Sequence, residues 1–212
     1  MDKEYAFEHL PAYVSEQIEN AVGVLREGGI VAYPTDTVYG LGADVYNDEA
    51  VKKVFAIKNR PLSLPLPVLI ADAEQVISLT SELSLTARSL MERFWPGGLT
   101  IIFAKSPLFN SMVLAGGGKI GIRLPDHPVP RLLIKELGRP IVGTSANLHN
   151  RETALTATEV HEHLGGLVDF IIDAGRCPGG AESTIIDVTA DPPRVLRHGI
   201  VPESEIRDSY RK

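Results

Sequence analysis

The 212-residue sequence contains a single cysteine, Cys177, and no long apolar run. A disulfide-stapled fold is excluded, because this thiol has no partner in the chain. The longest apolar stretches, such as Leu99–Ala104, are far too short to cross a bilayer, which takes about 20 residues. The acidic, mixed start Met1–Tyr5 also lacks the basic and then apolar order of a secretion signal. We therefore expect a cytoplasmic protein without a membrane partner.

Positive charge is also scarce, since 21 basic side chains face 27 acidic ones and the net charge is −6. Sequence-independent attraction of nucleic acid over the whole surface is therefore disfavoured, and any polyanion site must be a local basic concavity. The hydrophobic fraction of 44% is enough to form an ordinary core. No linker or charge block marks a boundary, so we predict one domain over residues 1–212, with a core over about 14–202.

Helical and strand patterns alternate along the chain. Val14, Ile18, Val22 and Leu25 recur at helical spacing before a double glycine, which predicts an amphipathic helix. Caps, prolines and glycines delimit further helices near residues 47–60, 84–95, 128–137, 156–165 and 203–212, and one more helix opens at Asp72. Apolar runs predict strands at 30–33, 66–71, 99–104, 120–124, 140–143, 167–173, 184–188 and 194–196. This order predicts an α/β fold with a mixed sheet and helices packed against it.

The common catalytic and nucleotide-binding motifs are absent. The sequence has neither a Gly-x-x-x-x-Gly-Lys-Ser/Thr loop nor a Gly-x-Gly-x-x-Gly after its first strand, and the run Gly116–Gly118 is more simply a flexible loop. Ser145 does not occupy a Gly-x-Ser-x-Gly elbow. The histidines, including His9 and His149, lack metal-ligand spacing, and Cys177 has no activating neighbour in sequence.

What the sequence does contain is a set of polar clusters at predicted strand and helix ends, where ligand sites commonly gather. Taken singly, each cluster has a plain structural explanation as a turn former, a helix cap or a favourable charge at a helix C-terminus. The clusters are Thr35-Asp36-Thr37, Lys58-Asn59-Arg60, Arg123, Ser145 with Asn147, Ser183-Thr184, and Arg197.

Together with their flanking residues, these clusters form a series of longer segments. The segments are Pro34–Gly42, Lys58-x-Arg60-Pro61, Phe94–Thr100, Arg123–Pro128, Ser145-Ala146-Asn147 and Glu182–Asp187. In this order, over roughly residues 14–202, they resemble the YrdC-like threonylcarbamoyl-AMP synthase family in its short, single-domain form. The resemblance implies a twisted mixed β-sheet with flanking helices around a basic cavity. It also implies synthesis of threonylcarbamoyl-AMP and pyrophosphate from L-threonine, bicarbonate and ATP, for a downstream machinery that modifies transfer RNA.

The resemblance further implies roles for individual residues. The family's catalytic quartet falls on Lys58, Arg60, Ser145 and Asn147. Contacts to L-threonine are expected from Thr35, Arg123 and Thr184, with the arginine on the carboxylate. Contacts to ATP are expected from Lys58, Asn59, Arg60, Ser145, Asn147, Ser183 and Arg197. Mg²⁺ is expected on the phosphates of ATP, where it needs few protein ligands, so the lack of an acidic metal motif is no objection.

The chemistry agrees with these residue types. A carbamate oxygen must attack the α-phosphorus of ATP, so both reactants are anions, and a lysine and an arginine suit their oxygens. We expect Lys58 and Arg60 to be exposed in one shared pocket. Two alternatives remain open at this point: a double-stranded RNA-binding module with a possible RNA contact, and a relative of the same fold without synthase activity.

Overall fold

The computed structural model describes residues 10–148 and 151–210. The N-terminal segment that argued against a secretion signal, together with His9 and His149, lies outside the described residues, and so do the last two residues of the predicted C-terminal helix. Within the described ranges, no helix is both long enough and apolar enough to cross a membrane.

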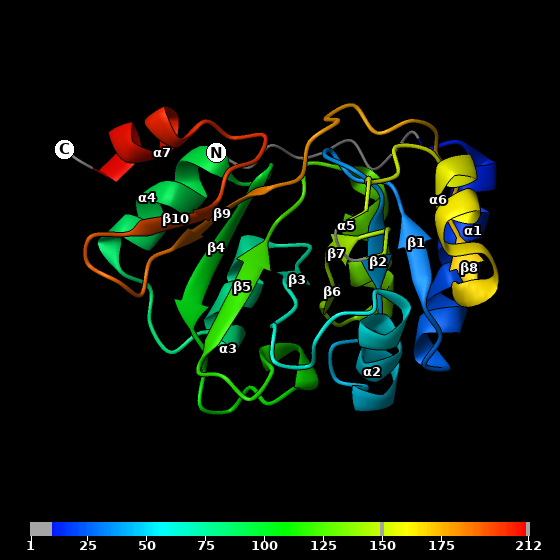
Figure 1. The fold of residues 1–212 in the computed structure, drawn as a ribbon, viewed down its shortest axis with the longest axis horizontal. Helices are drawn as coiled ribbons and strands as arrows, with labels where there is room; N and C mark the ends of the chain where they lie inside the picture. Colours follow the sequence, from blue (N-terminus) through cyan, green and yellow to red (C-terminus); the bar gives the residue numbers. More distant parts are fainter. Residues whose placement is uncertain (1–9, 149–150, 211–212) are drawn as a thin grey trace.

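The strands of the described chain form two mixed sheets (Figure 1). The smaller sheet has the order β7-β2-β1-β8, made by Thr144–Ser145, Gly40–Gly42, Val31–Tyr33 and Phe170–Ile171. The larger has the order β10-β9-β4-β5-β3-β6, made by Arg194–Arg197, Thr184–Asp187, Leu99–Ala104, Lys119–Arg123, Val68–Leu69 and Ile141–Val142. Each sheet contains parallel and antiparallel pairs. The predicted mixed α/β architecture is therefore confirmed, with the strands shared between two sheets.

The two sheets meet at β6. Residues 141–142 pair with the larger sheet and residues 144–145 with the smaller one, so the chain changes sheet at Gly143. A Cβ atom on Gly143 would lie 2.5 Å from Cγ of Leu69, so only glycine fits this crossing without displacing a neighbour. Just beyond β2, an isolated bridge pairs Asp44 with Ile141 and connects the sheets directly.

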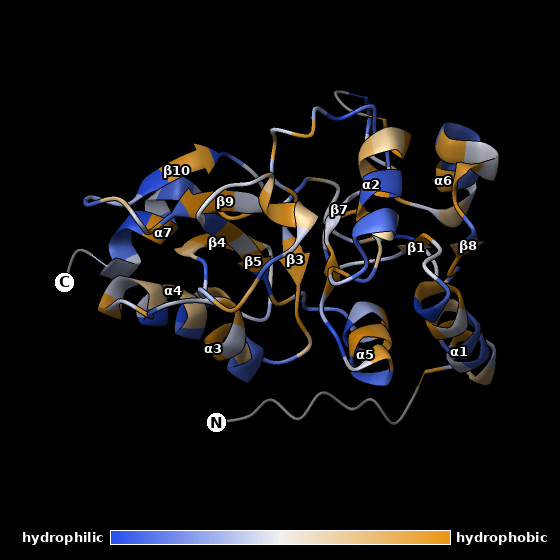
Figure 2. Cartoon of the chain, turned by 90° about the horizontal axis from the view of Figure 1, so that it is seen from below, coloured by the Kyte–Doolittle hydropathy of each residue, from blue (hydrophilic) through white to orange (hydrophobic). Residues whose placement is uncertain are grey.

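Helices cover these sheets, as the apolar periodicity predicts. Helices α1 (Ala12–Arg26) and α5 (Pro128–Leu137) lie side by side (Figure 2) and share one apolar cluster with β1. A larger apolar cluster lies among the sheets and the remaining helices, which are α2 (Asp48–Ile57), α3 (Val76–Leu79), α4 (Leu85–Phe94), α6 (Ala157–Leu164) and α7 (Glu203–Tyr210). The Asn47 side chain caps α2 by accepting a hydrogen bond from the amide of Ala50, as expected.

The polar and glycine-rich segment Pro34–Gly42 after β1 predicts a loop, but its end forms β2. Gly40 and Gly42 lie against the two edges of the Tyr33 ring, and a Cβ atom on either would come within 2.6 Å of it. The Tyr33 hydroxyl in turn donates to the backbone oxygen of Val142 across the junction of the sheets. Because Gly40 and Gly42 have no side chains, strand β2 can pack directly against the Tyr33 ring of β1.

Candidate active site

A cavity lies between the two sheets and is lined by residues from both. It holds about 790 Å³ of empty space, its open mouth included, which is within the usual range for small-molecule sites. The predicted site residues that line it are Thr35, Arg60, Arg123, Ser145, Ser183 and Arg197. The sequence therefore identified residues from separate segments that the fold brings into one hollow.

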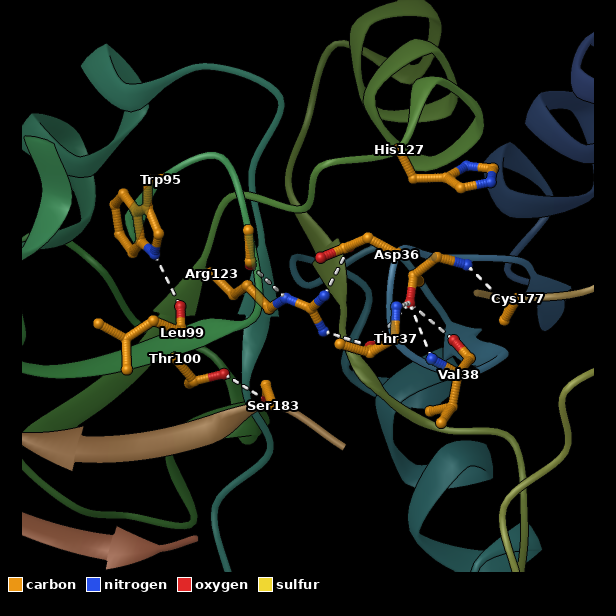
Figure 3. A network of polar contacts seen from close by, with 12 residues as sticks. Asp36, Thr37, Val38, Trp95, Leu99, Thr100, Arg123, His127, Cys177 and Ser183 are labelled. Atoms are coloured by element: carbon orange, nitrogen blue, oxygen red, sulfur yellow. Dashed lines mark hydrogen bonds and ion pairs between the residues drawn. The ribbon is translucent and has the colours of Figure 1, made fainter. Parts of the chain in front are cut away.

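On one wall, Arg123 at the end of β5 is held on three sides (Figure 3). Its Nη2 donates to the carboxylate of Asp36 at 2.6 Å, its Nη1 to the hydroxyl of Thr37 at 2.9 Å, and its Nε to the backbone oxygen of Gly97 at 2.9 Å. The residue is only 6% exposed. A planar guanidinium is thus presented at the wall in one orientation.

Next to it, the Thr35 hydroxyl organises the turn that carries Asp36 and Thr37. This oxygen accepts hydrogen bonds from the amides of Thr37 and Val38, at 3.0 and 3.2 Å, and donates to the backbone oxygen of Val38 at 2.7 Å. Such a side-chain turn is common for a threonine. The Thr35 hydroxyl therefore stabilises this turn, in addition to any contact with a substrate.

A second arginine of the cavity lies at the end of β10, in the same six-stranded sheet as Arg123. Arg197 Nη1 pairs with the carboxylate of Glu182 at 2.9 Å, while its Nε and Nη2 donate to the backbone oxygen of Ser183 at 3.0 and 2.7 Å. Its Nη2 also donates to the Ser183 hydroxyl, which lies 2.8 Å from the hydroxyl of Thr100 on β4. In this part of the cavity, a guanidinium therefore lies beside two hydroxyl groups.

Arg60, just after α2, adds positive charge to the same hollow. It donates from Nε to the backbone oxygen of Leu64 and from Nη2 to that of Pro65. Burial lowers the pKa of its guanidinium, and the nearby charge of Arg197 lowers it further, whereas Glu182 opposes the shift. Two arginines with one carboxylate between them leave an excess positive charge that an anionic ligand can neutralise.

Lys58 differs from the prediction. The expectation that it is exposed in the cavity is wrong, because it is only 3% exposed and does not line the hollow. Its ammonium donates to the backbone oxygens of Ser145 and Asn147, at 2.6 and 2.8 Å, and to Oδ1 of Asn147 at 2.9 Å. Burial lowers the pKa of this ammonium to about 8. All three of its N–H donors therefore hold the chain that carries Ser145.

The Ser145–Asn147 segment is cross-linked within itself as well. The Ser145 hydroxyl donates to Oδ1 of Asn147 at 2.7 Å, and the Asn147 amide donates to the backbone oxygen of Arg151. Asn147 is buried behind the wall, whereas Ser145 lines the cavity. The structure thus joins Lys58, Ser145 and Asn147 in one hydrogen-bonded group.

Two other predicted residues do not line the hollow. The hydroxyl of Thr184 is fully buried, where it donates to the backbone oxygen of Val201 at 2.7 Å and accepts from that residue's amide. Asn59 is exposed at the end of α2, with a left-handed backbone at φ 48°. Their expected contacts with L-threonine and ATP, like the roles of the other site residues, remain predictions.

The acidic partners Asp36 and Glu182 were not among the predicted site residues. Each is ion-paired with a predicted arginine, Arg123 or Arg197. A signal was present in the sequence, because both acids stand within the polar segments and an arginine that is partly removed from water favours a nearby opposite charge. The lone thiol of Cys177 is buried, which raises its pKa to about 11, so it stays protonated and inert as expected.

The described residues contain no group of three His, Cys, Asp or Glu side chains placed to hold a metal ion. Within that part of the chain, the site therefore offers no protein cage for Mg²⁺. Its residues fit an ion that arrives on the phosphates of a nucleotide and keeps its waters, since Mg²⁺ commonly binds in this way.

An α/β fold with three arginines around one cavity is typical of proteins with a site for small anionic molecules. The chain belongs to the Sua5_yciO_yrdC family, whose model, described as "Telomere recombination", matches residues 23–199. Two similar relatives are proteins named threonylcarbamoyl-AMP synthase. The one from Bacillus subtilis is 43% identical over 90% of this chain, and the one from Pyrococcus abyssi is 41% identical over 91%.

Solved structures agree with this family. The chain is similar to the crystal structure of P. abyssi Sua5 complexed with L-threonine, with a TM-score of 0.88 and 40% identity over 92% of this chain and 57% of that one. It is also similar to Escherichia coli YciO, with a TM-score of 0.81 and 29% identity over 91% and 93% of the two chains. The chain spans 55% and 58% of the length of the B. subtilis and P. abyssi relatives.

Proposed function

We propose that this chain is an L-threonylcarbamoyladenylate synthase, which forms threonylcarbamoyl-AMP and pyrophosphate from L-threonine, bicarbonate and ATP. The observation that carries the proposal is the gathering of three arginines, Arg60, Arg123 and Arg197, around one cavity. A reaction between an amino-acid carbamate and a nucleoside triphosphate needs cationic groups for both anionic reactants. The names of the relatives support the same reading.

In this proposal L-threonine binds at the Arg123 wall. The guanidinium has five N–H donors, of which three are engaged by Asp36, Thr37 and Gly97, so two remain for the substrate carboxylate. The similar P. abyssi Sua5 structure is a complex with L-threonine, which supports this choice of amino acid. The amine of threonine then combines with bicarbonate to give the carbamate and water.

ATP binds in the part of the cavity where Arg60, Arg197 and Ser145 face its phosphates. Lys58 and Asn147 support Ser145 from behind the wall through the hydrogen bonds already described. A carbamate oxygen attacks the α-phosphorus, the bond to the β-phosphate oxygen breaks, and pyrophosphate leaves. Because an adenylyl group is transferred, the enzyme is a nucleotidyltransferase.

In this mechanism, positioning of the two reactants and neutralisation of their negative charge lower the activation barrier. Alignment of two bound reactants can lower a barrier by about 7–11 kcal/mol in favourable cases, and preorganised donors stabilise the charge that develops on the phosphates. Mg²⁺ on the phosphates of ATP would add neutralisation of the leaving pyrophosphate. No general base is needed if threonine binds with its amine deprotonated in a dry pocket.

The test is a turnover assay on the purified protein with Mg²⁺, ATP, bicarbonate and L-threonine. We expect pyrophosphate release that depends on threonine, together with a threonylcarbamoyl-AMP product detected by mass spectrometry. Serine and valine at the same concentration serve as matched amino-acid controls. ATP hydrolysis that is indifferent to threonine would reject the synthase.

The product is a mixed anhydride of a carbamate and a phosphate, so it hydrolyses readily and needs a partner that accepts the threonylcarbamoyl group. We propose that the partner is the machinery that transfers this group to transfer RNA in the cytoplasm. The similar proteins give no support to the alternative of a double-stranded RNA-binding module.

A further inference from the structure

We propose that Asp36 is a positioning residue for amino-acid binding, which holds the Arg123 guanidinium in the orientation that receives a carboxylate. The inference deepens the proposed function and rests on it, because it concerns how the Arg123 wall recognises its amino acid. Asp36 itself does not line the cavity and therefore acts through the arginine.

The geometry carries this assignment. Asp36 Oδ1 accepts from Nη2 of Arg123 at 2.6 Å, the shortest of the three hydrogen bonds that hold the guanidinium. The other two bonds go to neutral oxygens, so among these three partners in the described structure the carboxylate alone carries a charge. Figure 3 shows Asp36 and Thr37 reaching the guanidinium from one turn while the chain near Trp95 approaches it from the other side.

Burial strengthens the need for this partner. The Arg123 side chain is 7% exposed and that of Asp36 is 15% exposed. A guanidinium at that depth without a counter-charge is costly, and an empty pocket supplies none. Asp36 therefore neutralises the charge of Arg123 before the substrate arrives. It accepts from Nη2 alone, so it leaves other N–H groups of the guanidinium for the substrate.

The turn that carries Asp36 is itself rigid. The Thr35 hydroxyl receives two backbone amides of this turn, and the amide of Gly180 donates to the backbone oxygen of Thr37 at 3.1 Å. The residues before and after Asp36 are therefore both held by hydrogen bonds, which fixes the position of its carboxylate. A fixed carboxylate can in turn fix a flexible arginine, whose side chain otherwise has many rotamers.

The experiment measures binding by calorimetry with two ligands, L-threonine and L-threoninamide, in which a neutral amide replaces the carboxylate. In the unaltered protein we expect threonine to bind more tightly than threoninamide. In Asp36→Ala the dissociation constant for threonine should rise about 10-fold, as for the loss of one charge-assisted contact, while that for threoninamide changes less than about twofold. Asp36→Asn, whose oxygen can still accept from Nη2, should restore most of the preference.

The control is Asp44→Ala, because Asp44 is also buried and ion-paired, to Arg139 at 2.9 Å, but Arg139, unlike Arg123, does not line the cavity. It should leave the preference for threonine unchanged. If Asp36→Ala does not fold, Asp36→Ser takes its place, since a serine hydroxyl is too short to reach the guanidinium.

The outcomes separate the two proposals. If the unaltered protein binds threonine no better than threoninamide, the proposed function fails and this inference fails with it. If the unaltered protein prefers threonine and Asp36→Ala, or Asp36→Ser, keeps the same preference, only the positioning role is overturned. Equal weakening of both ligands would also overturn it, because a merely structural residue acts on both alike.

Discussion

At the scale of single residues, Lys58 and Arg60 separate into a buried cation and an accessible one. We expect Lys58→Ala to destabilise the protein by about 2–4 kcal/mol, because it removes three hydrogen bonds that a buried ammonium makes to the Ser145–Asn147 segment. Arg60→Ala should cost less than about 1 kcal/mol, since its two hydrogen bonds are exposed. Both variants should lose threonine-dependent pyrophosphate release.

Urea denaturation followed by circular dichroism, beside the pyrophosphate assay, measures both effects. Equal stability of the two variants would contradict the buried role of Lys58. The sequence predicts that both side chains are exposed in the cavity, and the structure corrects this for Lys58. The residues bonded to this ammonium lie 87 and 89 positions further along the chain, which no local pattern reveals.

At the scale of elements, helix α5 begins with an unusual cap. The Nδ1 atom of His127 accepts a hydrogen bond from the amide of Val129 at 3.2 Å, which requires a neutral imidazole. Burial lowers the pKa of His127 to about 4, although the charge of Asp36 opposes the shift. The folded pKa lies below the ordinary value of about 6.5, so between about pH 6.5 and 4 the unfolded chain binds more protons.

Stability should therefore fall as the pH is lowered through this window. We expect a loss of about 2 kcal/mol from this residue between about pH 6.5 and 4. In His127→Asn, a cap that does not titrate, that part of the pH dependence should disappear. Chemical denaturation at a series of pH values measures it, and an unchanged slope in the variant would show that His127 is not the titrating group.

The elements also show how far sequence patterns reach. Strand β4 and helix α5 have the predicted bounds, Leu99–Ala104 and Pro128–Leu137, because a proline, a glycine or a run of apolar residues marks each end. The predicted strand 140–143 instead ends at Val142, and β7 follows after one residue. Strands of two residues have no periodicity to detect, since their pairing partners and not their own residues define them.

The spacing of Thr156 and Glu159 predicts a capping box at the start of α6, which is present in part. The Thr156 side chain accepts from the amide of Glu159, as expected. The Glu159 carboxylate, however, accepts from the amide of Leu155, one residue before the cap. The local sequence predicted the start of the helix, while the backbone before it decided which amide the carboxylate reaches.

At the scale of the whole molecule, the segment between β8 and β9 crosses from the smaller sheet to the larger one (Figure 1). On this crossing, a Cβ atom on Gly179 would lie 2.6 Å from the backbone oxygen of Asp36 and 2.7 Å from Cα of Thr37. Backbone atoms cannot yield as a flexible side chain does, so Gly179→Ala must displace the crossing or the turn beneath it.

We expect Gly179→Ala to lower stability by about 1–3 kcal/mol and to weaken threonine binding. The matched control is Gly118→Ala, an exposed loop glycine whose added Cβ would meet nothing within 4 Å. Thermal unfolding with and without L-threonine measures both quantities. A variant that matches the control in stability and in its response to threonine would refute the close contact between the crossing and the turn.

The sequence by itself determined the α/β class, most helices and longer strands, and the polar segments that line the site, because caps, glycines and apolar periodicity act over a few residues. Only the tertiary structure decided that the strands form two sheets, that Lys58 lies behind the wall, and that Asp36 and Glu182 neutralise the arginines. Burial and ion pairing depend on residues far apart in the chain, so they follow from packing and not from local pattern.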